Sequence, residues 1–338
     1  MRISFSLAFV LFAQLTWGQQ FQIKNIETDV NSTFRGLSIV NDQVAWVSGS
    51  SGWVGISTDG GHTWNFNQVK GYETSGFRSL YGFDQNKAII ANAGSPANIL
   101  VTIDAGKTWE VVYTNNHDAA FLDGIDFWNE NEGLIYGDPI NGKMLLLKTT
   151  DGGSTWNEVV NAPDLHKGEA SFAASGTGIR CIGKDKAIIS TGGMVSRLWT
   201  TPDKGKTWSD IAPPTVQGEA ATGIYSFAVN NKNIVLVGGD YTRPDLATKH
   251  NLYSKDGGAT WSTPAESSRG YRECVEFITN NTLLTTGPTG TDISYDQGAN
   301  WKAFSETEGF HVLRIARKGA LTIIAGNNGQ IGLIEKEK

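Results

Sequence analysis

The chain has 338 residues, of which 40 are glycine, 39% are hydrophobic and only 18% are charged. This composition argues against a long coiled coil, which is rich in charged helix formers, and against a disordered chain, which is poor in apolar residues. The net charge of −6 gives no basic excess of the kind that a nucleic-acid partner requires. We therefore expect a folded protein that does not bind nucleic acid.

Residues 1–18 have the features of a secretory signal peptide. Arg2 precedes an apolar run from Ser6 to Trp17, which is too short to span a bilayer. We expect cleavage before Gln19, so that residues 19–338 form the mature protein as a single domain. No cysteine lies directly after the apolar run, which argues against a lipid anchor, and no later segment is apolar over eighteen residues, which argues against a membrane span. We therefore expect a periplasmic or secreted protein. An uncleaved N-terminal anchor is the alternative.

One pattern, Ser/Thr-x-Asp-x-Gly-x-Thr/Asn-Trp, occurs six times along the chain. The first copy is Ser57 to Trp64, and successive copies are 45, 47, 52, 53 and 40 residues apart. Such a period is the signature of a repeat architecture in which every repeat is one supersecondary unit. The six aspartates of the pattern are Asp59, Asp104, Asp151, Asp203, Asp256 and Asp296.

The residue types in the pattern are those of a stapled β-hairpin turn. An aspartate carboxylate accepts hydrogen bonds from the backbone of its own turn, and glycine adopts a conformation that other residues avoid. The tryptophan buries a large face where neighbouring elements meet. A chemical site would not be copied six times around a fold, so we expect these aspartates to be structural.

Four short strands in roughly 45 residues form one blade of a β-propeller, and six such units are present. After Trp301 the chain has three more strand-like runs, Phe310–Ala316, Gly319–Ala325 and Gln330–Glu335. One further run, Phe21–Glu27, precedes the first unit. Pairing of the two ends completes a seventh blade and removes the exposed edges of an open ring. The sequence therefore predicts an all-β, seven-bladed propeller.

The repeat resembles the Asp-box, or bacterial neuraminidase repeat, over nearly all of the mature chain. Among the families that carry it, the chain is most similar to the photosystem II stability/assembly factor-like proteins of non-photosynthetic bacteria. That resemblance implies a seven-bladed propeller with a binding or assembly role and no established catalysis. The resemblance rests on five sequence segments: Phe121 to Ile125, Tyr136 to Pro139, Ser171 to Thr177, Gly238 to Tyr241 and Gly309 to His311.

Sialidases also carry Asp boxes, and they begin with a Phe/Tyr-Arg-Ile-Pro motif. Here Phe34-Arg35-Gly36-Leu37 and Phe77-Arg78-Ser79-Leu80 keep the aromatic residue and the arginine but lack the proline. This departure disfavours sialidase activity.

A binding site is expected on the face opposite the Asp-box turns, where the innermost strands begin. We align the starts of these strands as Phe34-Arg35, Phe77-Arg78, Phe121-Leu122-Asp123, Phe172-Ala173, Tyr225-Ser226, Tyr271-Arg272 and Phe310-His311. The alignment places a basic arc of Arg35, Arg78, Arg272 and His311 at the channel mouth. Guanidinium groups match carboxylates and phosphates, so the arc would bind an anion. Alternatively, these side chains pair with neighbouring acids and only fill the channel.

The opposite arc of the channel carries the acids Asp123, Asp138 and Glu169, with Asp240 and Tyr241 beside them. The first hypothesis is a non-catalytic binding protein that recognises an acidic protein segment or a carboxylate. The alternative is a sialidase-like hydrolase or lyase that acts on an acidic sugar. In that case Arg35, Arg78 and Arg272 would bind the sugar carboxylate, and Asp123, Asp138 or Glu169 would transfer protons.

Other residue types indicate neither a metal nor a cofactor. The five histidines lack metal-ligand spacing, and no glycine-rich stretch follows a strand and opens a helix. Cys181 and Cys274 fall on inner strands of the non-adjacent blades four and six, so we expect free thiols. We expect a monomer without cofactors.

Overall fold

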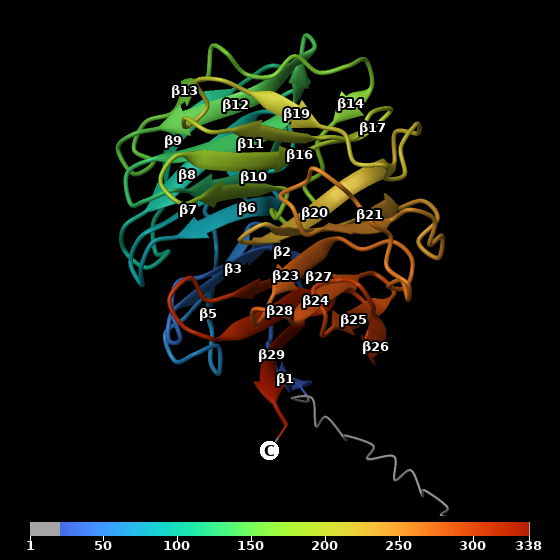
Figure 1. The fold of residues 1–338 in the computed structure, drawn as a ribbon. Coiled ribbons are helices and arrows are strands. Elements are labelled where there is room, and N and C mark those ends of the chain that lie inside the picture. Colours follow the sequence, from blue (N-terminus) through green and yellow to red (C-terminus); the bar gives the residue numbers. More distant parts are fainter. Residues whose placement is uncertain (1–20, 338) are drawn as a thin grey trace, which may run out of the picture.

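Seven antiparallel β-sheets make up the molecule, as the ribbon of Figure 1 shows. The computed structural model describes residues 21–337, so the predicted signal peptide, residues 1–18, lies outside the described residues. Strands of neighbouring blades contact one another from blade to blade until the ring closes. Within the described part, the single helical element is the 3₁₀ turn η1 (Asn327–Gly329), and no helix there has the length and apolar character to cross a membrane.

Blades one to three each have four consecutive strands. They are β2 (Phe34–Ile39), β3 (Ala45–Gly49), β4 (Trp53–Ser57) and β5 (Asn65–Gln68) in blade one; β6 (Phe77–Gly82), β7 (Ala88–Asn92), β8 (Ala97–Thr102) and β9 (Glu110–Asn115) in blade two; and β10 (Leu122–Phe127), β11 (Gly133–Ile140), β12 (Lys143–Thr149) and β13 (Asn157–Glu158) in blade three.

Blades four, six and seven also have four strands each, whereas blade five has three strands and two short additional ones. The strands are β15 (Ile179–Ile182), β16 (Lys186–Ser190), β18 (Leu198–Thr201) and β19 (Ser209–Ile211) in blade four; β20 (Thr222–Asn230), β21 (Asn233–Asp240) and β22 (Asn251–Ser254) in blade five, extended by the short β17 (Gly192–Gly193) and β14 (Glu169–Ala170); β23 (Cys274–Phe277), β24 (Leu283–Gly287), β25 (Gly290–Ser294) and β26 (Lys302–Ser305) in blade six; and β27 (Phe310–Ile315), β28 (Thr322–Gly326), β29 (Ile331–Lys336) and β1 (Phe21–Ile26) in blade seven.

The two ends of the chain meet in blade seven. β1 pairs with β29 in antiparallel register, from Phe21 opposite Lys336 to Ile26 opposite Ile331. In Figure 1 the two strands lie together at the bottom of the view. The predicted seven-bladed propeller, closed by the N-terminal strand, is therefore confirmed.

The Asp-box turns share one set of hydrogen bonds. In the first turn the Ser57 hydroxyl donates to Asp59 Oδ1 over 2.8 Å, and the Thr63 amide and hydroxyl donate to the two carboxylate oxygens over 2.9 and 2.6 Å. Gly61, at φ 85°, lies in the region that favours glycine. The same carboxylate contacts recur at Asp104, Asp151, Asp203, Asp256 and Asp296. This is the geometry of a hairpin staple, with every carboxylate oxygen occupied.

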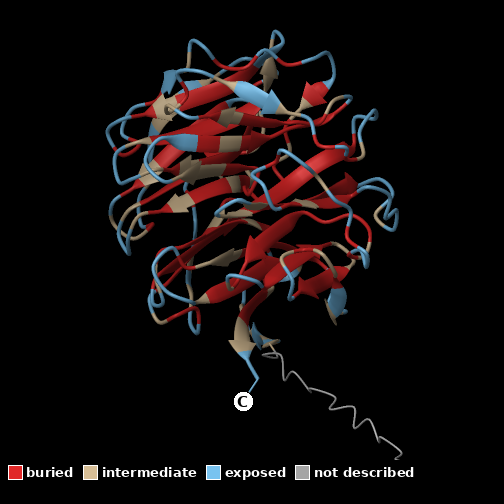
Figure 2. Ribbon diagram, viewed as in Figure 1, coloured by how far each residue is buried: buried red, intermediate tan, exposed pale blue. Residues whose placement is uncertain are grey.

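The apolar core lies between neighbouring blades. Figure 2 shows that the strands are mostly buried and the connecting loops mostly exposed. One cluster joins blades six, seven and one through Ile293, Leu313, Phe310 and Phe34. Trp46 fills the space between blades one and two, and its indole donates to the Asp84 carbonyl over 2.8 Å. The aromatic residues thus fix each blade against the next.

The Asp-box carboxylates predict a loss of stability in acid. Hydrogen bonds from the backbone and hydroxyl of Thr108 lower the pKa of Asp104 to about 2, and the pKa values of Asp203 and Asp256 are also about 2. In the unfolded chain these groups have ordinary, higher pKa values, so the unfolded state binds more protons between roughly pH 4 and pH 2. The stabilisation is present above this window and is lost as the pH falls through it. Urea-unfolding midpoints measured from pH 5 to pH 2.5 should therefore fall steeply below pH 4.

The Asp104→Asn variant is the control for this experiment. It should be less stable than the parent at pH 5, and its unfolding midpoint should depend less on pH. Identical pH dependence in the parent and in the variant would contradict a role of the Asp104 hydrogen bonds in acid sensitivity.

Candidate functional site

A β-bulge recurs where the innermost strands begin. In β2, β6, β10, β20 and β27 the pairing register shifts at the same place, and one residue is left without a partner on the second strand. A bulge redirects the side chain of its extra residue. The residues in this position are Arg35, Arg78, Asp123, Tyr225 and His311. Four of the five are basic or acidic residues, so the bulges gather ionisable groups at one end of the channel.

A cavity of about 320 Å³, here called the mouth pocket, lies at this end of the channel. Its aromatic wall is compact, because the Phe172 and Tyr225 rings stack with centroids 3.9 Å apart and Tyr271 meets Tyr225 edge-on at 4.7 Å. The pocket is lined by Arg35, Arg78, Phe172, Ala173, Ala174, Tyr225, Tyr241, Tyr271 and Glu273. It therefore combines two guanidinium groups and one carboxylate with an aromatic wall.

Residues 171–178, here called the plug, cross the channel below the mouth pocket. The Ala174 carbonyl accepts a 2.7 Å hydrogen bond from Arg35 of blade one, and the Ser175 hydroxyl donates over 2.7 Å to the Glu273 carbonyl of blade six. The Gly176 carbonyl accepts from Arg314 of blade seven over 3.0 Å. The expectation that Phe172-Ala173 begins the inner strand of blade four is wrong, because that strand, β15, begins at Ile179.

Glu273 organises the charges of the pocket, although the sequence did not single it out. Its carboxylate is 3.1 Å from Arg35 Nη1 and 2.5 Å from His311 Nδ1, and it accepts a hydrogen bond from the Tyr271 hydroxyl. Burial opposes ionisation, but Arg35 and His311 outweigh it and lower the pKa of Glu273. Two members of the predicted basic arc are thus paired with one buried acid.

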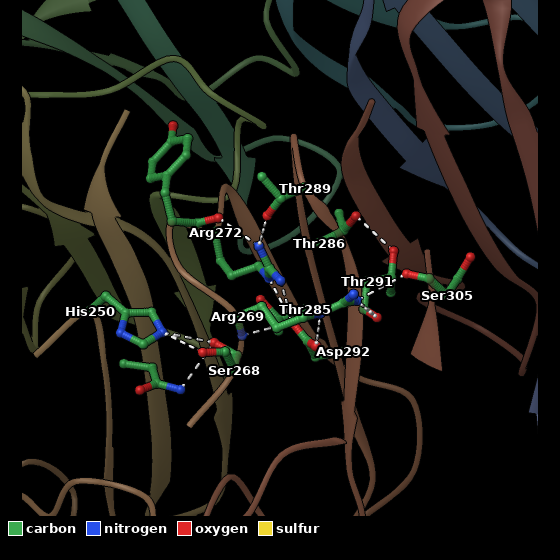
Figure 3. A network of polar contacts seen from close by, with 12 residues as sticks. His250, Ser268, Arg269, Arg272, Thr285, Thr286, Thr289, Thr291, Asp292 and Ser305 are labelled. Atoms are coloured by element: carbon green, nitrogen blue, oxygen red, sulfur yellow. Dashed lines mark hydrogen bonds and ion pairs between the residues drawn. The ribbon is translucent and has the colours of Figure 1, made fainter. Parts of the chain in front are cut away.

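Arg272, the third predicted arginine of the arc, does not line the mouth pocket. It is fully buried, and its Nε and Nη2 lie 2.8 and 2.5 Å from Asp292 Oδ2 inside blade six (Figure 3). Its Nη1 donates to the Tyr271 carbonyl and to the Thr289 hydroxyl. The sequence alignment was shifted by one residue in this blade, and such a shift exchanges the two faces of a strand.

Arg78 has no hydrogen bond or ion pair to any residue in the described part of the chain. Burial and the neighbouring Arg35 lower its pKa, while Asp123 and Glu273 act in the opposite direction. A guanidinium group remains charged under all ordinary conditions. Arg78 is therefore the cation of the mouth pocket that is available to a ligand.

The three predicted acids differ in burial and in hydrogen-bond partners. Asp123 is 1% exposed, neither carboxylate oxygen has a hydrogen-bond partner, and burial raises its pKa well above the usual value. Asp138 accepts the Ser171 amide over 2.9 Å and borders a second hollow of about 640 Å³ with Phe121 and Pro139. Burial also raises the pKa of Asp138.

Glu169 forms a buried ion pair with Arg197, an arginine that the sequence did not single out. Its carboxylate lies 2.5 Å from Arg197 Nη2 and accepts the Thr191 hydroxyl over 2.6 Å. Although burial opposes ionisation, these contacts lower the pKa of Glu169. Asp138 and Glu169 thus border the same hollow of about 640 Å³, whereas Asp123 is buried and does not line it.

The loop between β21 and β22 contributes one residue to the mouth pocket. Asp240 is buried and accepts hydrogen bonds from the Thr242 amide and hydroxyl and from Arg243. Tyr241 is 56% exposed and lines the pocket. Asp240 thus holds the loop, and Tyr241 is the side chain that this loop offers to a ligand.

The described residues contain no group of three or more His, Cys, Asp or Glu side chains suited to a metal ion. Cys181 and Cys274 are both free thiols.

The resemblance predicted from the repeat is confirmed. Residues 92–231 match the family model described as photosynthesis system II assembly factor YCF48, and residues 252–263 match the BNR/Asp-box repeat. No curated protein sequence matches the chain.

Solved structures with the same fold include two YCF48 proteins. One, described as YCF48 bound to D1 peptide, has a TM-score of 0.66 at 15% identity, over 95% of this chain and 98% of that chain. YCF48 from Cyanidioschyzon merolae has a TM-score of 0.68 at 14% identity, over 93% and 99%. At this identity the similarity establishes the fold.

A glycoside hydrolase also shares the fold. The GH74 xyloglucanase from Xanthomonas campestris has a TM-score of 0.67 at 14% identity and covers 92% of this chain. The aligned region spans 53% of the xyloglucanase, so this chain corresponds to about half of that enzyme.

The different surroundings of the arginines predict different effects on stability. Arg272→Met removes a buried partner of Asp292, although Arg269 still contacts that carboxylate, so we expect a loss of about 2–3 kcal/mol. Arg78→Gln should change the free energy of unfolding by less than about 0.5 kcal/mol. Urea unfolding of both variants measures the difference, and equal destabilisation would contradict the assignment of Arg78 as the uncommitted arginine.

Proposed function

We propose that this protein is a secreted or periplasmic, non-catalytic binding protein of the assembly-factor type, which recognises an acidic protein segment at the mouth pocket. Residues 1–18 support the location outside the cytoplasm. The observation that carries the proposal is the position of Arg78, a cation in a preformed pocket without a partner among residues 21–337. Its charge favours an anionic ligand.

A carboxylate is the ligand chemistry that the pocket fits best. Arg78 offers a full guanidinium fork, and Arg35 is held beside it by Glu273 and the Ala174 carbonyl. A fork-to-carboxylate contact provides two parallel hydrogen bonds and therefore fixes the orientation of the ligand. The aromatic wall of Phe172, Tyr225 and Tyr271 would pack against the apolar part of the same segment. A pocket of about 320 Å³ has room for the end or one acidic side chain of a peptide.

The comparisons support a protein as the partner. A propeller of the same fold is described as bound to a D1 peptide, and the residues that match the assembly-factor family include the plug. At 15% identity the fold of the two proteins can be taken as the same, but the peptide that one binds cannot be assigned to the other. The partner of this chain is therefore inferred from its own pocket.

The alternative function, cleavage of an acidic sugar by a hydrolase or a lyase, uses the same arginines but requires accessible acids. Asp123 has almost no exposed surface, and Glu169 is committed to Arg197. In the hollow that Asp138 borders, Glu169 is held by Arg197, and the other carboxylate is that of the exposed Asp118. Glycosidases ordinarily hold two carboxylates in fixed positions on either side of the scissile bond. The binding hypothesis needs no such pair and is favoured for this reason.

The proposal predicts how peptide affinity depends on Arg78. Fluorescently labelled peptides with acidic ends should bind to the purified mature protein, and amidation of their carboxylates should weaken binding. Arg78→Gln should weaken binding about tenfold or more, because a charge-assisted hydrogen bond is lost. Arg78→Lys, which keeps the charge but not the fork, should have an intermediate affinity. Fluorescence anisotropy measures the peptide affinity of the parent, of Arg78→Gln and of Arg78→Lys.

Lys70→Gln is the control, because it also removes a positive charge and lies on the loop that leads to β6 and Arg78. Lys70 is exposed and does not line the mouth pocket. This variant should bind the peptides as the parent does. Binding that is insensitive to Arg78→Gln would contradict the proposal. Turnover of uronate or sialyl oligosaccharides that disappears in Asp138→Asn would establish the alternative instead. Co-purification from the native host with the parent and with Arg78→Gln would then identify the natural partner.

A further inference from the structure

A second cavity, here called the box-side chamber, lies at the opposite end of the channel. It has a volume of about 250 Å³ and is bordered by the ends of the inner strands, on the side of the Asp-box turns. The plug separates it from the mouth pocket, because the Gly176 carbonyl accepts a hydrogen bond from Arg314 of the chamber. The lining includes the apolar Leu37, Leu80, Ile125 and Ile315 and the charged Asp126, Arg180, Glu276, Arg314 and Arg317.

The charges inside the chamber do not cancel in pairs. Arg180 lies 2.9 Å from Glu276, and Arg314 lies 3.8 Å from the same carboxylate oxygen. Asp126 has no basic group at ion-pair distance among residues 21–337, and its two oxygens accept the backbone amides of Cys181 and Phe127 over 2.7 and 2.9 Å. Burial raises the pKa of Asp126, and the nearby Arg314 and Arg180 act in the opposite direction. Two half-buried arginines therefore share one carboxylate.

A third arginine lies at the entrance of the chamber. Arg317 stacks on the Tyr81 ring at 4.3 Å and donates hydrogen bonds to the Ser38 hydroxyl and the Gly82 carbonyl. No acid within residues 21–337 lies at ion-pair distance from it. Positive charge concentrated around an apolar cavity is costly without a counter-ion. The chamber thus provides guanidinium groups beyond those that its own carboxylates neutralise.

We propose that the box-side chamber is a second binding site, which takes a small organic anion. A carboxylate or phosphate head would lie between Arg314 and Arg317, and an apolar body would pack on Leu37, Leu80 and Ile125. The volume restricts the ligand to a small molecule. The site is independent of the proposed function, since the plug lies between the two cavities.

The chamber has a path to solvent that avoids the plug. It shares Tyr81, Phe127 and Arg317 with an open hollow of about 820 Å³ on the same face. Of the two acids in that hollow, Glu132 is paired with Lys204 at 2.5 Å, and Glu130 is exposed. Arg317 and Lys318 line the same hollow and offset the charge of Glu130, so an anion can approach along the aromatic wall of Tyr81 and Phe127.

Cys181 makes occupancy of the chamber measurable. It lines the chamber and is half-buried, whereas Cys274 is buried. The experiment titrates the mature protein with benzoate, phenyl phosphate and inorganic phosphate by calorimetry, with benzamide as the uncharged control. In parallel, mass spectrometry follows the alkylation rate of Cys181. We expect one or both organic anions to bind and to slow alkylation of Cys181 several-fold, whereas benzamide does neither. Preference for benzoate or for phenyl phosphate identifies the head group.

Variants at the two ends of the channel separate this site from the mouth pocket. Arg317→Gln, at an exposed position, should weaken binding of the anion about tenfold or more. Urea unfolding of this variant measures what the loss of the contacts with Ser38 and Gly82 costs in stability. Arg78→Gln should leave the affinity for the anion unchanged. The proposal is overturned if no organic anion protects Cys181, or if Arg78→Gln abolishes binding while Arg317→Gln has no effect. Either result leaves the peptide-binding proposal open to its own test.

Discussion

The pairing of β1 with β29 is the contact on which the rest of the structure depends. Each blade is a small sheet that cannot bury its apolar faces alone and needs a neighbour on both sides. Blade seven exists only when both ends of the chain join it, and its core residues pack against blade six on one side and blade one on the other. An open ring would expose both of these faces and an unpaired edge. Closure therefore fixes the diameter of the channel and the distances across it.

Within the closed ring, the bulges decide which side chains face the channel. Simple alternation along the inner strands would assign the wrong residues, because the bulged residue is an addition to the pattern. Arg35 and Arg78 are placed correctly by their sequence motif, because in both cases the preceding phenylalanine occupies the paired position. In blade six Arg272 has the place of that phenylalanine, and the next residue, Glu273, contacts Arg35 across the channel. Because of this shift of one residue, the channel position expected to hold Arg272 holds Glu273.

The number of blades and the closure of the ring could be predicted from the sequence, because the Asp box is a local pattern repeated at a regular spacing. The plug and the ion pairs could not be predicted in this way. Phe172 fits the pattern of an inner-strand start, yet it lies in the plug and stacks on Tyr225. Arg272 with Asp292 and Glu169 with Arg197 are contacts between residues 20 and 28 positions apart, which no local pattern specifies. The periodicity of the sequence predicts the strands, whereas the partner of each charged side chain is known only from the folded structure.

The plug holds an arginine at each end of the channel, in a protein whose net charge is −6. Its carbonyl oxygens accept hydrogen bonds from Arg35 on one side and from Arg314 on the other. A carbonyl satisfies a guanidinium donor but carries no formal charge, so the plug positions both arginines, and Glu273 and Glu276 offset their charges. Each end also retains one arginine, Arg78 or Arg317, with no acid at ion-pair distance among the described residues. The plug thus positions cations on both of its faces, and net charge, a property of the whole chain, cannot report either of them.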